Sequence, residues 1–278
     1  MGKVALCFKE NLNSLMKKEV ETIDFTMVDR DICELPENGY QQLIPYVVFR
    51  SLDAESGRLN LLQYKRPDQG DGEERLAGKV SIGFGGHIDE VEEVVYSAIV
   101  DNEDGSCTYK LNVFDIVNTA IKSATREIKE ELGIDITNGD FDISTDTIMK
   151  KASFFAGELS EEVNQVHTGI LVLIDCTQEQ MDSIKTSSGV NAEEVQELSI
   201  LGVNLDVIVE EMDINNTVVR ITNQLHQHNM ENWSCLVFDY ILKLTIFSIF
   251  SGITYNDLYK VAMQKKAEAI SEQDLEVV

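Results

Sequence analysis

Apolar residues recur in short runs along the first half of the chain, and these runs predict β-strands. Residues 42–51 and 58–66 read as two strands joined by a turn. Residues 79–93 are typical of a short strand that runs into a glycine turn. Apolar stretches on both sides of the polar segment DNEDGS predict a β-hairpin over residues 94–114. Residues 1–40 are mixed in character and predict no particular element.

The helix that follows the hairpin is the best-defined element of the sequence. Asp115 or Asn118 is expected to cap its first turn, because both side chains accept hydrogen bonds from free backbone amides. Gly133 is expected to end it in a left-handed turn. Apolar side chains recur at spacings of three and four residues and predict its buried stripe: Val117, Ile121, Ala124, Ile128 and Leu132.

The second half of the chain adds strands and then becomes helical. Residues 146–159 and 165–176 read as strands, and residues 189–203 can hold one more short strand. The pattern turns helical after residue 205, and the apolar segment 240–253 predicts a buried helix because it is too short to span a bilayer. Because strands and helices interleave, the expected class is α/β or α+β with a mixed sheet.

Composition narrows the range of partners. The chain has 278 residues and a formal net charge of −26, so broad binding to nucleic acid or to an anionic membrane is not expected. A small phosphorylated ligand is compatible with this charge, because a bound metal ion can supply local positive charge. Five cysteines without a CxxC pair predict a reducing, cytoplasmic setting and no zinc site. The first ten residues lack the apolar run of a signal peptide.

The segment SATREIKEELGI places an unusual group of acids on the helix. Glu127, Glu130 and Glu131 lie within a sector of about 100° beside the apolar stripe. Oxygen-only clusters of this kind suit hard cations such as Mg²⁺ or Mn²⁺. The alternative is an acidic helix face in contact with solvent, which is the common reading of a charge run.

A second motif favours the metal site. The segment GFGGHIDEVE places Gly85 and Gly86 after a strand, where a glycine pair lets the main chain approach a ligand closely. Together with REIKEELGI, it resembles the Nudix hydrolase box, G-x5-E-x7-R-E-U-x-E-E-x-G-U, in which U is aliphatic. Glu92 takes the place of the first glutamate, with Glu90 and Glu93 as alternatives. Residues 93–125 separate the halves where the family has seven, and we assign the extra length to an insertion over 93–118 that contains the hairpin.

The resemblance covers roughly residues 40–244 and is strongest to a subgroup of bacterial and phage Nudix proteins known as predicted phosphoesterases. It implies a Nudix α/β/α sandwich with a mixed sheet over residues 1–244, plus the inserted hairpin. Residues 245–278 are expected to form an added C-terminal helical extension.

The resemblance also implies a Mg²⁺-dependent or Mn²⁺-dependent hydrolase that cleaves a nucleoside diphosphate linked to another group by water attack at phosphorus. Candidate substrates include nucleoside triphosphates, ADP-ribose, dinucleoside polyphosphates and signalling nucleotides. Glu130 and Glu131 would be metal ligands, and Glu127 a further ligand or the catalytic base. The carbonyl of Gly85 or Gly86 would complete the metal shell. Arg126 would pair with Glu92 and fix the loop to the helix.

Several further residues are candidates for the site. Lys65, Arg66, Arg75 and Lys79 flank the glycine turn and can bind phosphate or serve as ordinary surface charges, and Gly86 and His87 can approach the substrate. Many Nudix enzymes recruit one more glutamate from outside the box, and the candidates here are Glu158, Glu161, Glu162, Glu194 and Glu197. The family is often dimeric, so a homodimer is expected. The alternatives to an enzyme are a catalytically quiet nucleotide-binding module and a scaffold for partner docking.

Overall fold

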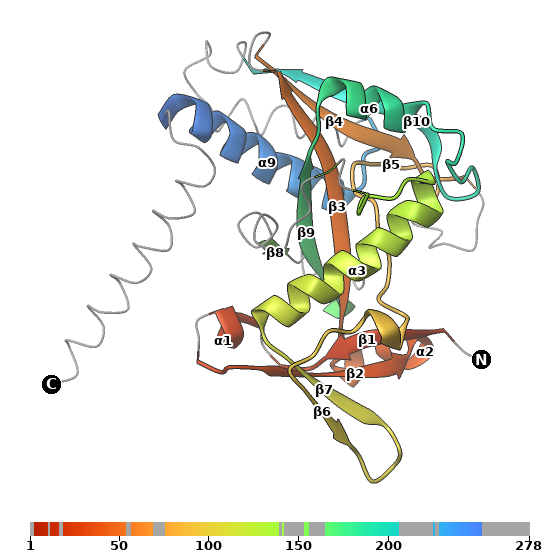
Figure 1. The fold of residues 1–278 in the computed structure, drawn as a ribbon, viewed down its shortest axis with the longest axis vertical. Coiled ribbons are helices and arrows are strands. Elements are labelled where there is room, and N and C mark those ends of the chain that lie inside the picture. The colour runs from red at the N-terminus through yellow and green to blue at the C-terminus, as the bar shows by residue number, and fades with distance from the viewer. Residues whose placement is uncertain are drawn as a thin grey trace, which may run out of the picture.

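The computed structural model describes residues 3–10, 12–16, 19–53, 57–68, 76–138, 141, 153–155, 165–205, 225 and 228–251. Within this part, ten strands form one mixed sheet. The central strand is β3 (Gln41–Asp53), which pairs antiparallel with β4 (Arg58–Lys65) and β1 (Val4–Phe8) and parallel with β9 (His167–Asp175). Figure 1 shows β3 and β9 crossing the middle of the molecule side by side.

The remaining strands extend this centre on both sides. The short strand β5 (Val80–Ser81) and the strand β10 (Gln196–Asn204) both pair with β4, and β8 (Ser153–Phe155) pairs with β9. On the other side, β2 (Ile23–Asp29) pairs with β1. The hairpin of β6 (Ala98–Asp101) and β7 (Cys107–Leu111) is joined to the sheet because β7 pairs with β2.

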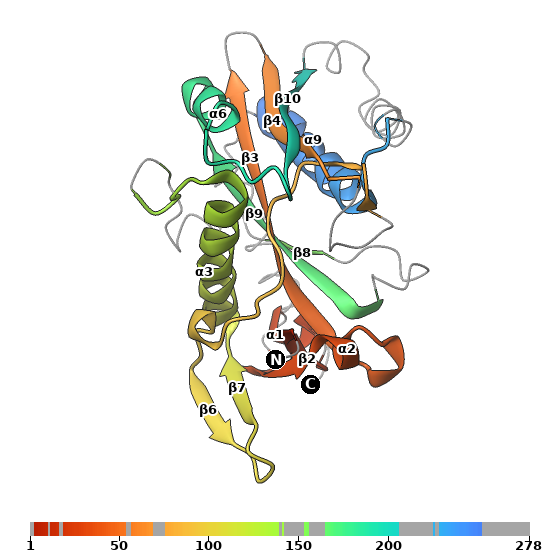
Figure 2. The same cartoon turned by 90° about the vertical axis from the view of Figure 1, so that its right-hand side faces the viewer.

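Helices cover both faces of the sheet. The helices α3 (Val113–Leu132) and α6 (Gln178–Lys185) contribute buried residues to one core, and α9 (Asn232–Ser251) contributes them to a second core. Figure 2 shows α3 and α9 on opposite sides of the sheet. The short helices α1 (Leu12–Met16) and α2 (Arg30–Cys33) accompany the N-terminal strands. The expected mixed sheet between helical layers is confirmed.

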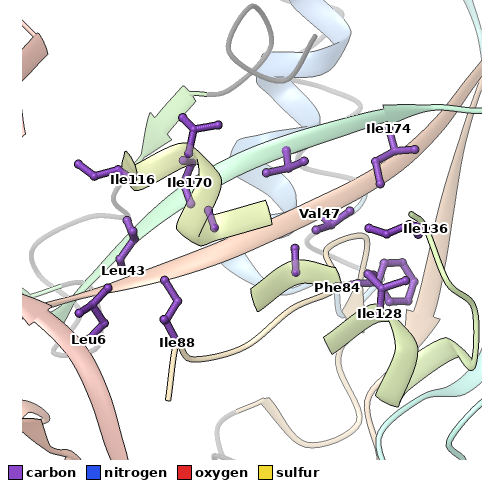
Figure 3. Close-up of a cluster of buried hydrophobic side chains, with 14 of the residues drawn as sticks. Leu6, Leu43, Val47, Phe84, Ile88, Ile116, Ile128, Ile136, Ile170 and Ile174 are labelled. Carbon is purple, nitrogen blue, oxygen red and sulfur yellow. The ribbon is translucent and has the colours of Figure 1, made fainter. Parts of the chain in front are cut away.

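The alternation of side chains along the strands creates the two cores. Val47 and Phe49 of β3 lie in the α3 core, whereas Tyr46 and Val48 lie in the α9 core. Figure 3 shows part of the α3 core, where Phe84 lies beside Ile128. Two buried faces explain why β3 and β9 read as nearly continuous apolar runs.

The helix prediction is confirmed at its end and corrected at its start. Gly133 caps α3 in the left-handed region, at φ 66°. The N-cap is Asn112, not Asp115 or Asn118, because Asn112 accepts the Asp115 amide while the Asp115 carboxylate accepts the Asn112 amide. The predicted stripe is buried apart from Ile121, which is partly buried against the same core.

Other predictions have mixed outcomes. The strands expected at 42–51, 58–66 and 165–176 and the hairpin within 94–114 are present, and β10 is longer than the short strand expected. The strands β1 and β2, which lie in the mixed segment 1–40, and the helix α6 were not predicted. Helix α9 continues across the proposed domain boundary at 244/245, and residues 252–278 lie outside the described part. Among the described residues, no helix combines the length and apolar character that crossing a membrane requires.

Candidate functional site

Two glycines bring the loop after β5 against helix α3. Phe84 exchanges two backbone hydrogen bonds with Val47, which fixes the loop to the centre of β3. Gly85 then adopts φ 131°, and a Cβ there would lie 2.3 Å from the Pro45 carbonyl oxygen. A Cβ on Gly86 would lie 2.8 Å from Oε1 of Glu127. Gly85 therefore has to be glycine, and a side chain on Gly86 would displace the Glu127 carboxylate from its place beside the turn.

Arg126 ties this loop to α3. Its Nη2 donates to the His87 carbonyl at 3.1 Å and to Oδ1 of Asp89 at 2.8 Å. Its Nη1 lies 3.0 Å from a carboxylate oxygen of each of Glu127 and Glu130. Each of these partners adds a charge-assisted contact to one rigid guanidinium fork. The arginine therefore fixes the glycine turn against the helix, in the role that the sequence predicts for it.

The acidic partner of Arg126 from the insertion is Glu93 rather than Glu92. Nε of Arg126 donates to Oε1 of Glu93 at 2.8 Å. A short 3₁₀ helix over Val91–Glu93 turns Glu93 inward, where it is 6% exposed, and leaves Glu92 exposed. The predicted Arg126–Glu92 pair is therefore wrong, and the alternative at Glu93 is the one that forms.

Glu131, which is buried, and Glu127, which is half-buried, form an acidic pair on the inner edge of α3. Burial raises the pKa of Glu127 to about 7, with Glu130, Asp89 and Glu194 adding to the rise and Arg126 opposing it. Burial also raises the pKa of Glu131 well above its usual range, and the neighbouring Glu127 adds to this effect. Oε2 of Glu131 is buried without a hydrogen-bond partner. Two carboxylates in these surroundings favour binding of a proton or a cation.

Glu130 is exposed, although it contacts the same Arg126 nitrogen as Glu127. Its side chain is 55% exposed and its Oε2 accepts from Nη1 of Arg126. The three helix acids therefore do not converge on one point as predicted, and no group of three His, Cys, Asp or Glu side chains among the described residues does so. Glu130 and Glu131 are consecutive, so their side chains leave the helix about 100° apart.

The pair nevertheless fits a divalent cation of the Mg²⁺ class. Mg²⁺ retains several waters and is usually bound by one or two carboxylates together with substrate phosphates. Glu131 offers a buried oxygen without a partner, Glu127 lies next to it, and the main chain of Gly85 and Gly86 is in contact. We refer to these four residues as the α3 carboxylate site.

A loop after α6 brings Glu194 to the same place. The Asn191 amide donates to the Glu131 carbonyl at 2.9 Å, and Ser187 Oγ donates to the Leu132 carbonyl at 3.2 Å. The charge of Glu194 then raises the pKa of both Glu127 and Glu131. Of the acids considered outside the box, Glu197 lies 3.9 Å from Lys65 instead. Glu158, Glu161 and Glu162 lie outside the described residues.

The basic residues near the glycine turn are largely engaged. Nε of Arg66 donates to Oε2 of Glu231 at 3.0 Å, and Nζ of Lys65 lies 3.3 Å from Asp68. The sequence does not predict Glu231 as a partner of Arg66, because Glu231 is a single acid before an apolar helix. Arg75 lies outside the described residues.

His87 lies in different surroundings from the carboxylates. Burial lowers its pKa to about 3, and the charges of Arg30, His167 and Lys3 act in the same direction. Its ring centre lies 5.6 Å from that of His167. Only the His87 backbone carbonyl takes part in the Arg126 contacts described above. The imidazole is therefore a neutral, largely enclosed group whose Nε2 is buried, and its predicted contact with substrate stays a prediction.

Comparisons with known proteins add little to this picture. No protein-family model and no curated protein matches the sequence. Among solved structures, the chain is similar to Tm1382, a protein provisionally classed as a Nudix hydrolase. The identity is 18%, the alignment covers 87% of this chain and 100% of that one, and the TM-score is 0.43. A similarity at this level carries no argument about activity, which rests on the residues of the site itself.

Proposed function

We propose that this protein is a divalent-cation-dependent hydrolase of the Nudix type, which cleaves the phosphoric anhydride of a nucleoside diphosphate linked to another group. The observation that supports the proposal is the pair of buried Glu131 and half-buried Glu127 beside a glycine turn that Arg126 fixes in place. A structural pair of acids would be expected to have basic partners for both carboxylates, whereas Glu131 keeps one buried oxygen without any partner.

Each residue of the site has an assigned role in this proposal. Glu131 and the carbonyl of Gly85 or Gly86 would hold Mg²⁺ or Mn²⁺, while Glu127 beside them would act as the base. The cation would neutralise the diphosphate and acidify a bound water. Glu194 is the candidate for a further acidic contact, since it lies close enough to affect both helix acids.

Glu127 is assigned to move the proton. A general base works best when its pKa lies near the operating pH, and the pKa of Glu127 is about 7. Water oxygen attacks phosphorus, the anhydride P–O bond breaks, the leaving phosphate takes the electron pair, and Glu127 takes the proton of the water. Arg126 keeps Glu127 oriented toward Gly86 throughout this step.

A nucleotide panel tests the proposal. Purified protein is incubated with nucleoside triphosphates, ADP-ribose, dinucleoside polyphosphates and signalling nucleotides, with and without Mg²⁺, while products are separated by chromatography. We expect Mg²⁺-dependent turnover that falls by about 10²–10⁴-fold in Glu127→Gln. The matched control is Glu103→Gln, which removes the same charge from the exposed tip of the hairpin and should retain activity.

Two results would contradict the proposal, the first its site and the second its reaction. Turnover that persists in Glu127→Gln and Glu131→Gln would place the chemistry elsewhere. Nucleotide binding without turnover would favour the nucleotide-binding module, a reading that the exposure of Glu130 also supports.

A further inference from the structure

A second buried glutamate lies on the opposite face of the sheet, in the residue before α9. Oε1 of Glu231 accepts hydrogen bonds from Tyr46 at 2.8 Å, Ser81 at 2.7 Å and Ser234 at 2.9 Å. Its Oε2 accepts from Nε of Arg66 at 3.0 Å. Burial acts to raise the pKa of Glu231, but Arg66 and the three hydroxyls outweigh it and hold the pKa below its usual range. Glu231 is therefore a stable, fully hydrogen-bonded anion.

Arg66 contacts this anion directly, and its charge also acts on Glu131 of the α3 carboxylate site. It follows the end of β4, and its guanidinium carbon lies 5.6 Å from the ring centre of Tyr64. Tyr64 belongs to the α3 core, whereas the Glu231 partner Tyr46 belongs to the α9 core. Arg66 therefore lies next to a tyrosine of the α3 core while it bonds to Glu231, and its charge acts on Glu131 as well as on Glu231.

The Arg66 guanidinium therefore interacts with two buried carboxylates, and it interacts more strongly with Glu231 than with Glu131. Glu231 receives the direct Arg66 contact, while Oε2 of Glu131 remains without a partner. If the guanidinium moved to Glu131, it would form the ion pair that this oxygen lacks and would compete with a metal ion for it. The three hydroxyls around Glu231 hold the carboxylate in the position that prevents this movement.

We propose that Glu231 is a positioning residue that holds the Arg66 guanidinium away from Glu131 and so keeps Glu131 free to bind a divalent cation. The inference rests on the proposed function, because it requires that the α3 carboxylate site binds a cation. It assigns a role in cation binding to a residue that lies across the sheet and contacts no ligand itself.

The test is a titration with Mn²⁺ followed by electron paramagnetic resonance, without any substrate. We expect Glu231→Gln to weaken Mn²⁺ binding by about 10–100-fold, the usual range for outer-shell partners of metal ligands. The double variant Arg66→Gln/Glu231→Gln should restore the affinity of the wild type, because the displaced cation is then absent. Rescue of this kind separates positioning from a purely structural role.

Two further variants keep the test interpretable. Asp239→Asn is the matched control, since it changes an acid on α9 whose partner Lys243 lies 2.7 Å away on the surface, and it should leave binding unchanged. Tyr46→Phe removes one hydroxyl from Glu231 without changing charge, and it should weaken binding by less than Glu231→Gln does. If Glu231→Gln does not fold, the Mn²⁺ affinity of Tyr46→Phe tests the positioning role instead.

The outcomes separate the two proposals. Equal Mn²⁺ binding by the wild type and Glu131→Gln would contradict the proposed function itself. Tight binding by the wild type that Glu231→Gln and Tyr46→Phe leave unchanged would overturn the positioning role alone. Loss of binding in Glu231→Gln that the double variant does not restore would also overturn it.

Discussion

Glu131 and Glu231 are both buried, at 6% and 3% exposure, and yet their surroundings have opposite effects. Glu231 accepts hydrogen bonds from three hydroxyls and one guanidinium, and its pKa is lowered. Glu131 has one oxygen without a partner, and its pKa is raised by burial and by Glu127. Burial alone therefore does not indicate function, whereas burial without hydrogen-bond partners does so when a second acid lies beside it.

The largest expected effect is on the free energy of unfolding, and substitutions at Glu231 and at Glu131 should change it in opposite directions. Glu231→Ala should destabilise the protein by about 3–5 kcal/mol, because it removes the buried acceptor that the hydroxyls of Tyr46, Ser81 and Ser234 share. Glu131→Gln should stabilise it by about 1–3 kcal/mol at neutral pH, because folding no longer buries an acid. Urea unfolding of both variants measures the free energies.

The sign of the second effect follows from the raised pKa. Folded Glu131 holds its proton to a higher pH than unfolded Glu131, so the fold loses stability as pH rises above the ordinary glutamate value. Glutamine cannot ionise, so Glu131→Gln should not lose stability in this way as the pH rises. A destabilised Glu131→Gln would mean that Glu131 is a structural acid like Glu231.

The next effect is stabilisation by the cation. Mn²⁺ at about one hundred times its Kd should stabilise the wild type by about 2.7 kcal/mol, and Glu131→Gln should lose this gain. Thermal unfolding with and without Mn²⁺ measures it. An equal shift in both proteins would indicate binding at another of the many acidic residues.

The smallest effect concerns His87, whose Nε2 is also buried without a partner. Its pKa of about 3 lies below the ordinary 6.5, so the unfolded state binds the proton first and stability falls as pH drops through this window. The loss is at most about 1.4 kcal/mol for each pH unit. His87→Gln should reduce the decline between about pH 7 and about pH 5 in urea unfolding. If stability declines equally in the wild type and in His87→Gln, protonation of carboxylates causes the decline.

The sequence predicted what depends on local pattern. The course of α3 and its end at Gly133 follow from helical spacing and a C-terminal glycine. The meeting of the glycine turn with Arg126 and Glu127 follows from the motif. The Asn112 cap was missed because Asn112 lies within an apolar run that reads as strand.

Long-range contacts could not be predicted in the same way. The choice of Glu93 over Glu92 depends on one short 3₁₀ turn. The Glu231 cluster joins residues that lie far apart in sequence, and no periodicity indicates such a group. The hairpin also joins the sheet through β2, in a region without any clear pattern, so its pairing could not be foreseen.

Anomalous diffraction from crystals soaked in Mn²⁺ tests the central claim most directly. We expect a peak within coordination distance of the Glu131 carboxylate, beside Glu127 and the main chain of Gly85 and Gly86, and no such peak in Glu131→Gln. A wild-type map with no peak there, or with manganese bound only at other acidic residues, would contradict the account.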